Sequence, residues 1–143
     1  MPSRDFDLLA SRILSFAKKA LGDAGAVVPL GAAISLDGEF RPIQRIYAPN
    51  QKVTAPELAD EIVGIFRNLA RDKQARSVAW CVDMQVVLPG ATENTTALVL
   101  FCESADGESG KLITPYHGAP GPTTTFASPY MRAHRPKVFV GSA

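Results

Sequence analysis

Cysteine and histidine are scarce in this chain: its 143 residues include two of each. A structural zinc site needs four such ligands at short spacings, and His117 and His134 stand in an irregular C-terminal stretch without those spacings. We therefore expect neither a metal nor another cofactor. Two cysteines are also too few for a disulfide framework, so Cys81 and Cys102 indicate a cytoplasmic protein with two reduced, buried thiols.

The chain has neither a long apolar run nor an excess of charge of one sign. No uninterrupted apolar stretch approaches the ~20 residues of a membrane-spanning helix. With 15 basic and 14 acidic residues the formal net charge is +1, which argues against nucleic acid and against a membrane as partners. No Asp or Glu follows Glu108, but the basic residues after it are too dispersed for a nucleic-acid-binding patch.

Motifs of the common enzyme classes are missing as well. The chain has no phosphate-binding loop of spaced glycines with a lysine, no serine in a nucleophile elbow, and no histidine close to either cysteine in sequence. Because the members of a triad are often distant in the chain, a catalytic site assembled in space stays open. The sequence itself favours a protein that is not an enzyme.

What the sequence does contain is a long pair of apolar strands, within residues 76–103, around which the rest is arranged. In the first strand Val78, Trp80 and four further apolar side chains take every second position, which directs them to one face of a sheet. The opposite face, with Cys81 and Asp83, is mixed. We expect the first face to meet a core and the mixed face to meet water, a partner or a ligand.

The rest of the chain shows the periodicity of two helices and three more strands. Helical spacing marks residues 5–21 and 54–73, and strands are expected near residues 28–36, 40–47 and 111–116. The order helix, two strands, helix, three strands predicts an α+β fold: a single antiparallel sheet of about five strands with two helices packed on one face. Residues 1–116 form this domain, and residues 117–143 form a Pro/Gly-rich tail packed on the domain or on a neighbouring subunit.

This element order resembles that of the profilin-like group of folds, which includes the roadblock and longin modules. The resemblance is one of topology. It implies a role as a scaffold or a sensor, which fits the absence of catalytic motifs.

Four residues are candidates for a ligand site: Gly31, Trp80, Asp83 and Glu103. Gly31 precedes two alanines, and so little bulk lets a helix or a ligand approach closely, with helix packing the favoured interpretation. A carboxylate is unfavourable in mid-strand, so Asp83 is either a general base or ligand acceptor beside Glu103, or a solvated or ion-paired residue. Trp80 is expected to anchor the core between the sheet and the helices, near a possible groove.

These observations predict a small non-catalytic protein-interaction or scaffold module that forms a homo-oligomer, most simply a dimer. A toxin-neutralising immunity protein would look the same at this level. The alternatives are a small-molecule-binding sensor and, less favoured, an enzyme of unknown type. The tail retains apolar residues that need a place to bury, so we expect residues 138–140 to dock as an edge strand or an apolar clamp, on the same subunit or on a neighbour.

Overall fold

The computed structural model describes residues 4–25, 27, 29–43, 55–118, 121 and 123–139. Within them, the helices are α1 (Arg4–Ala24) and α2 (Ala55–Arg71). The strands are β1 (Leu30–Ile34), β2 (Phe40–Ile43), β3 (Ser77–Val87), β4 (Asn94–Ser104), β5 (Ser109–His117), β6 (Thr125–Phe126) and β7 (Tyr130–Arg132). The second strand was expected to reach residue 47, and residues 44–47 lie outside the described residues.

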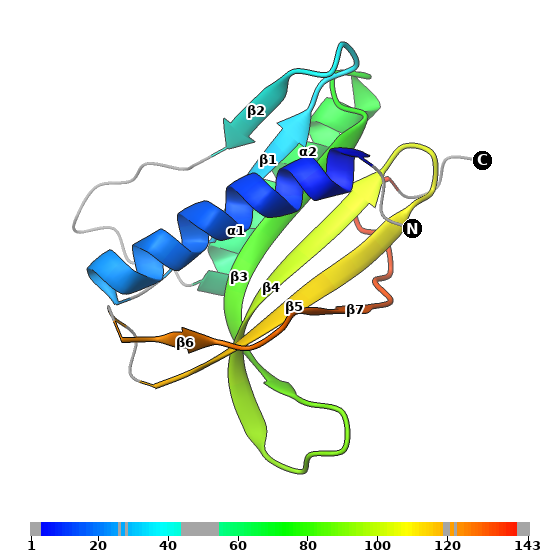
Figure 1. Cartoon of the computed structure of the whole chain (residues 1–143). Helices are drawn as coiled ribbons and strands as arrows, with labels where there is room; N and C mark the ends of the chain where they lie inside the picture. The colour runs from blue at the N-terminus through cyan, green and yellow to red at the C-terminus, as the bar shows by residue number, and fades with distance from the viewer. Residues whose placement is uncertain are drawn as a thin grey trace.

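The strands form one antiparallel sheet in the order β2-β1-β3-β4-β5, with the short strands β6 and β7 both pairing with β5 (Figure 1). β3 and β4 have eleven residues each and pair along their whole length, so they are the spine of the sheet. The α+β class and the antiparallel sheet predicted from the sequence are confirmed. The strand count is higher than predicted because the tail adds β6 and β7.

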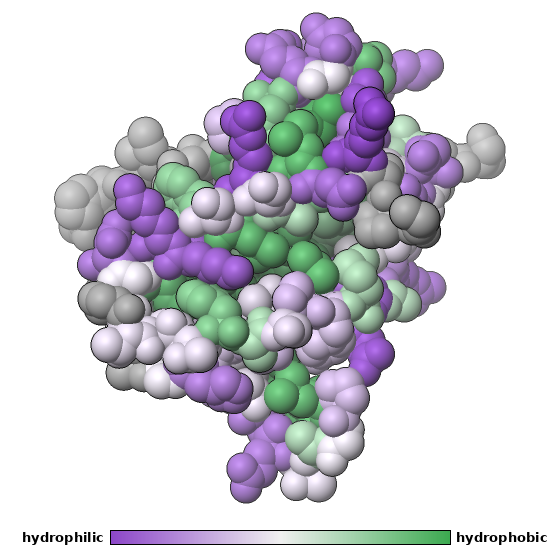
Figure 2. Space-filling view, viewed as in Figure 1, coloured by the Kyte–Doolittle hydropathy of each residue, from purple (hydrophilic) through white to green (hydrophobic). Residues whose placement is uncertain are grey.

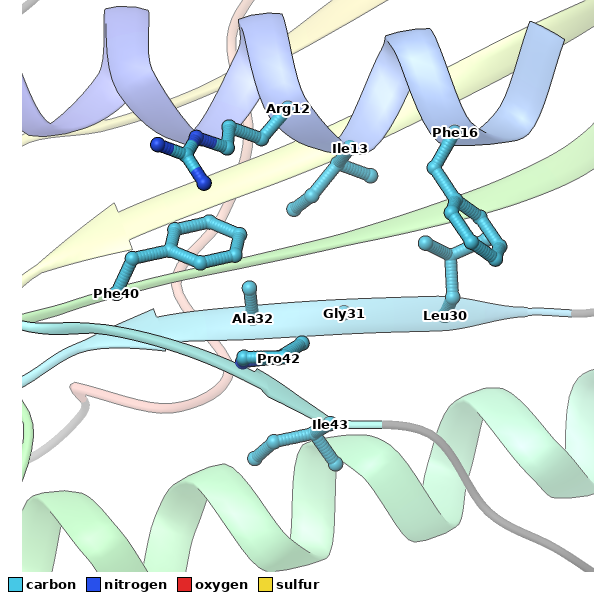
Figure 3. Close-up of a pocket in the computed structure, with 9 residues that line it drawn as sticks. All are labelled: Arg12, Ile13, Phe16, Leu30, Gly31, Ala32, Phe40, Pro42 and Ile43. Atoms are coloured by element: carbon cyan, nitrogen blue, oxygen red, sulfur yellow. The ribbon is translucent and has the colours of Figure 1, made fainter. Parts of the chain in front are cut away.

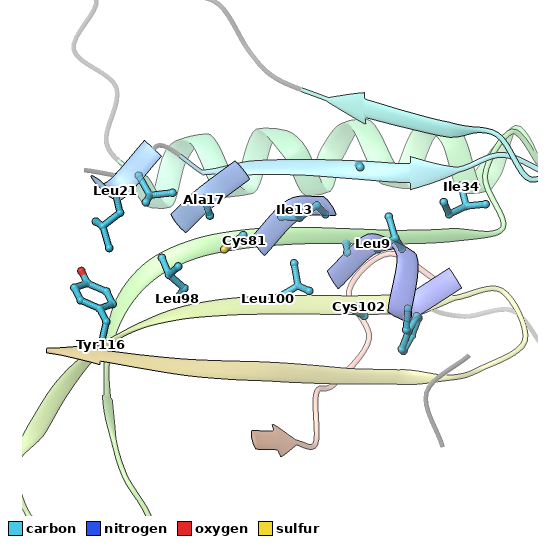
Figure 4. Packing of buried hydrophobic residues seen from close by; sticks show 14 residues of the cluster. Leu9, Ile13, Ala17, Leu21, Ile34, Cys81, Leu98, Leu100, Cys102 and Tyr116 are labelled. Carbon is cyan, nitrogen blue, oxygen red and sulfur yellow. The ribbon is translucent and has the colours of Figure 1, made fainter. Parts of the chain in front are cut away.

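Helix α1 crosses one face of the sheet, in front of the strands in Figure 1. Its buried stripe repeats every fourth residue, as expected for a helix with one apolar side. The stripe is Leu9, Ile13, Ala17 and Leu21, and it packs on Cys81, Leu98 and Leu100 of β3 and β4 (Figure 4). In its first turn the Asp5 carboxylate accepts hydrogen bonds from Arg76 and Ser77, which ties the start of the helix to the start of β3.

Helix α2 packs on the opposite face of the sheet, which corrects the prediction that both helices share a face. Its buried residues Ile62 and Phe66 belong to one cluster with Val78 and Trp80, and the rings of Phe66 and Trp80 lie 6.1 Å apart. Trp80 is 3% exposed, so it is the core anchor that the sequence predicted, but between the sheet and α2 alone.

The face of β3 that the sequence showed as mixed is therefore buried under α1 in its first half. Ser77, Ala79 and Cys81 are as inaccessible as Val78 and Trp80 on the other face. Small side chains let a helix approach a sheet closely, so a face without large apolar residues can still be a core face. Only beyond Cys81 does β3 become exposed.

The C-terminal segment packs on the same subunit within the part of the chain described. β6 and β7 line β5, and Val138 is buried in the cluster that contains Trp80. Residues 137–139 form a bend and no strand, so of the two predicted modes of docking the apolar clamp is the one seen for Val138. Residue 140 lies outside the described residues.

Candidate functional site

A groove of about 360 Å³ lies between α1 and the strands β1 and β2. One wall is a single stretch of α1, with Arg12, Ile13 and Phe16 pointing toward the strands (Figure 3). The lining from β1 and β2 consists of Leu30, Gly31, Ala32, Phe40, Pro42 and Ile43. Eight of these nine residues are apolar or glycine, and the exception is Arg12. Figure 2 shows apolar surface in this region, between α1 and β2, with hydrophilic side chains on both sides.

The groove exists because α1 packs mainly over β1, β3 and β4. β2 extends past the helix at the edge of the sheet, and Ala32 on β1 is too small to fill the space beneath it. Phe16 is left 53% exposed at the rim. A volume of this size is at the lower end of the range for small-molecule sites, about 300–1,000 Å³.

A second distinctive feature is the arm, by which we mean residues 82–97: the outer half of β3, the connecting turn and the start of β4. The arm projects beyond the rest of the sheet at the bottom of Figure 1. Met84 and Val87 on it are 41% and 56% exposed. Residues 84–92 include no charged side chain, so this part of the arm presents apolar and neutral polar groups, with Asp83 and Glu93 at its two ends.

Both edges of the arm are open within the described residues. β1 pairs with β3 only as far as Cys81, and β5 pairs with β4 only from Ala97 onward. The backbone N–H and C=O groups of residues 82–87 that point away from β4 therefore have no strand beside them. Unpaired strand edges of this kind bind further strands unless charges, prolines or covering segments protect them.

Glu103 is fully buried and holds the C-terminal segment in place. Its carboxylate accepts hydrogen bonds from the backbone N–H groups of Lys137, Val138 and Phe139, at 2.8, 2.8 and 3.1 Å. The fourth contact, 2.8 Å long, is with Nε2 of His134, whose ring also packs on Trp80 and Phe101. Burial on its own would raise the pKa of Glu103, but these hydrogen bonds outweigh it and hold the pKa below its usual value.

Asp83 lies on the α1 face of the sheet, where the Tyr116 hydroxyl donates to both of its carboxylate oxygens, at 2.8 and 3.0 Å. Partial burial raises the pKa of Asp83, and the hydrogen bond from Tyr116 offsets only part of that effect. Burial and the hydrogen bond together raise the pKa of Tyr116. The pair bridges β3 and β5 over β4, so Asp83 fixes the base of the arm.

The two cysteines share the α1 face of the sheet, which answers the question of register left open by the sequence. Cys81 pairs with Leu100 and Cys102 pairs with Ala79, so the thiols are diagonal neighbours. Both are free and buried. Burial raises the pKa of each thiol to about 12, so both are protonated at neutral pH and neither is an activated nucleophile.

The structure does not bring the four candidate residues into one site. Glu103 pairs with Val78, five residues along β3 from Asp83, so the two residues are offset by about 17 Å along the sheet and their side chains lie on opposite faces. The expectation that they lie beside each other is wrong. Trp80 is in the core, away from the groove. Gly31 lies on the floor of the groove, but a side chain at this position would point toward α2 on the other face of the sheet.

Sequence reasoning missed Arg12, His134 and Tyr116. Arg12 gave no signal, because an arginine on the polar side of a helix looks the same in the sequence whether or not a groove lies beside it. The partners of Glu103 and Asp83 lie 31 and 33 residues away in the chain, a separation that no local pattern can reveal. The one sequence signal of the groove was the small size of residues 31–33. These residues let α2 pack closely on β1, and they leave room for the groove beside α1.

The chain matches no protein-family model, and neither the curated proteins nor the solved structures contain a detectable relative. The resemblance to the profilin-like group therefore gains no support from a solved structure. In the described ranges no helix has both the length and the apolarity to cross a membrane. Among those same residues, no group of three or more His, Cys, Asp or Glu side chains is arranged to hold a metal ion.

Proposed function

We propose that the protein is a non-catalytic, cytoplasmic interaction module that pairs with a second copy of itself through the arm. The observation that carries this proposal is the edge of β3 at residues 82–87, beside which the described residues place no strand, together with the exposed apolar side chains on it. Addition of a strand to such an edge forms new backbone hydrogen bonds and buries side chains at the same time.

The chemistry of the arm is self-complementary, which favours a second copy as the partner. Two β3 edges related by a twofold axis pair antiparallel, each strand facing its own copy. A register centred on Met84 or Gln85 places Asp83 opposite Gln85 or Val87 of the other copy. Carboxylates therefore do not face each other, and the uncharged residues 84–92 contribute no repulsion.

The remaining polar groups favour a structural role over a catalytic one. Glu103 is fully occupied by four internal contacts, Asp83 is held by Tyr116, and both thiols are buried and protonated. Each of these four groups already has a role in packing. Two free cysteines also fit a reducing compartment.

Sedimentation velocity over a range of protein concentrations tests the proposal. We expect a dimer that dissociates on dilution, because an interface made by one arm is small. Met84→Lys places a charge opposite its own copy or opposite Val86, depending on the register, at a side chain that is 41% exposed. It should raise the dissociation constant about tenfold or more.

Leu36→Lys is the matched control, because Leu36 is 60% exposed in the β1–β2 turn, away from the arm, and receives the same change. It should leave the dissociation constant unaltered. A wild-type protein that is monomeric at every concentration would contradict the proposal. So would an equal effect of the two lysines.

A further inference from the structure

The groove between α1 and β2 differs from an ordinary surface depression in the chemistry of its rim. An adjoining hollow of about 380 Å³ shares Arg12 and Phe16 with it and is otherwise lined by Ser11, Ser15 and Lys19. The polar side chains around the mouth are thus two cations and two hydroxyls. The interior is apolar, and among the described residues no carboxylate lines either hollow.

Arg12 is the charged residue that lines both the groove and the adjoining hollow. Its guanidinium lies 5.2 Å from the centre of the Phe40 ring, so its charge stands over the apolar lining (Figure 3). Within the described part of the chain no ion pair joins Arg12 to a carboxylate. The nearby Glu39 carboxylate is instead bound by Arg41, 3.1 Å away.

We infer that this groove binds a small amphipathic carboxylate, a molecule with a hydrocarbon body and one anionic end. The body lies against Ile13, Phe16 and Leu30, and the carboxylate accepts hydrogen bonds from Arg12. An apolar lining with one cation at the mouth satisfies both ends of such a ligand, because the hydrocarbon leaves water and the carboxylate remains solvated and charge-paired. The site is separate from the arm, so this inference does not depend on the proposed function.

Isothermal titration calorimetry with three probes of equal chain length tests the inference. The probes are octanoate, octan-1-ol and octyltrimethylammonium, which share the hydrocarbon and differ in the charge of the head group. Octanoate should bind saturably, one molecule per chain, and about tenfold more tightly than the alcohol. The cationic probe should bind most weakly, because its head group faces Arg12 and Lys19.

Two variants assign the binding to this groove. Arg12→Gln should remove the preference for octanoate over octan-1-ol and leave the affinity for the alcohol unchanged. Phe16→Ser, at an exposed residue of the wall, should weaken both probes. Arg4→Gln is the matched control, the same substitution at an exposed position of the same helix outside the groove, and it should change neither affinity.

Several outcomes would overturn the inference. They are the absence of saturable binding by the wild type, equal affinities for the three head groups, and an Arg12→Gln variant that behaves like Arg4→Gln. Thermal unfolding of each variant without ligand checks that the fold is intact. Repetition with Met84→Lys keeps the two proposals apart, because a monomeric variant should bind octanoate as the wild type does.

Discussion

Glu103 shows how one buried carboxylate can hold a segment of chain that lacks regular structure. Three successive N–H groups and His134 point at it, so the N–H groups of the bend at residues 137–139 are satisfied without a strand or a helix. A neutral amide in place of the carboxylate would direct an NH₂ group at some of these donors. The charge of Glu103 is thus as important as its shape.

We predict that Glu103→Gln lowers the free energy of unfolding by about 2–4 kcal/mol, because charge-assisted hydrogen bonds in a buried site are lost. Urea denaturation at neutral pH measures the change. Glu93→Gln, the same substitution at an exposed residue of the β3–β4 turn, is the control and should have almost no effect. A similar loss in both variants would show that the buried contacts do not stabilise the fold.

The lowered pKa of Glu103 also predicts an acid-sensitive contribution to stability. A carboxyl group whose pKa is lower in the folded protein than in the unfolded chain stabilises the fold above the unfolded value, about 4.3. That contribution falls as the pH drops through the folded pKa. The wild type should therefore lose more stability than Glu103→Gln between neutral pH and the acid range, and parallel profiles would contradict this assignment.

At the scale of elements, the approach of α2 to β1 depends on Gly31. A Cβ atom added at Gly31 would lie 2.8 Å from the carbonyl oxygen of Ala79 and 2.9 Å from Cζ of Phe66. Relief of the first contact would shift β3, and relief of the second would move Phe66, and with it α2, away from β1. The low bulk noted in the sequence at this position therefore serves helix packing.

We predict that Gly31→Ala lowers the free energy of unfolding by about 1–3 kcal/mol through overpacking. Gly64→Ala is a control of opposite sign. Gly64 lies within α2 with no atom near its would-be Cβ, and alanine there should stabilise the helix by about 0.5–1 kcal/mol. Chemical denaturation of both variants checks the pair, and a stabilising Gly31→Ala would contradict the close packing of α2.

Regular elements were the part of this fold that the sequence predicted well. Periodicity predicts both helices, the hairpin of β3 and β4, and the core position of Trp80. Apolar residues recur at fixed intervals along a helix or a strand, and these intervals can be read from the sequence. The face covered by α1 was not predicted, since Ala79 and Cys81 are small and do not look like a core surface. β6 and β7 were missed because two or three residues carry no period.

The candidate site was predicted less well, for a reason that Asp83 and Glu103 make clear. An unusual carboxylate can be recognised in a strand, but its partner comes from tertiary contacts between distant parts of the chain. Tyr116 reaches Asp83 from β5, and His134 reaches Glu103 from beyond β7. The groove was also beyond prediction, since it results from where α1 lies relative to the edge strand β2.

At the scale of the whole molecule, the sheet is covered on its two faces by different means. α1 covers one face, whereas α2 shares the other with the C-terminal segment, which contributes Val138 and His134 beside Trp80 and Phe101. Arg67 of α2 adds a hydrogen bond of 2.7 Å to the Lys137 carbonyl. The C-terminal segment therefore completes the core on the face of the sheet that α2 covers in part.

Removal of residues 133–143 should expose Trp80 and Phe101 and leave the Glu103 carboxylate without its four contacts. We expect the free energy of unfolding to fall by at least about 3 kcal/mol, with lower solubility. The decisive measurement is a double-mutant cycle with Glu103→Leu, analysed by urea denaturation. In the full chain Glu103→Leu should destabilise the protein, because three N–H groups and His134 lose their acceptor. In the truncated chain the same change should have little effect, because these partners are already absent and the carboxylate is open to water. A Glu103→Leu effect of equal size and sign in both chains would show that Glu103 does not hold the segment.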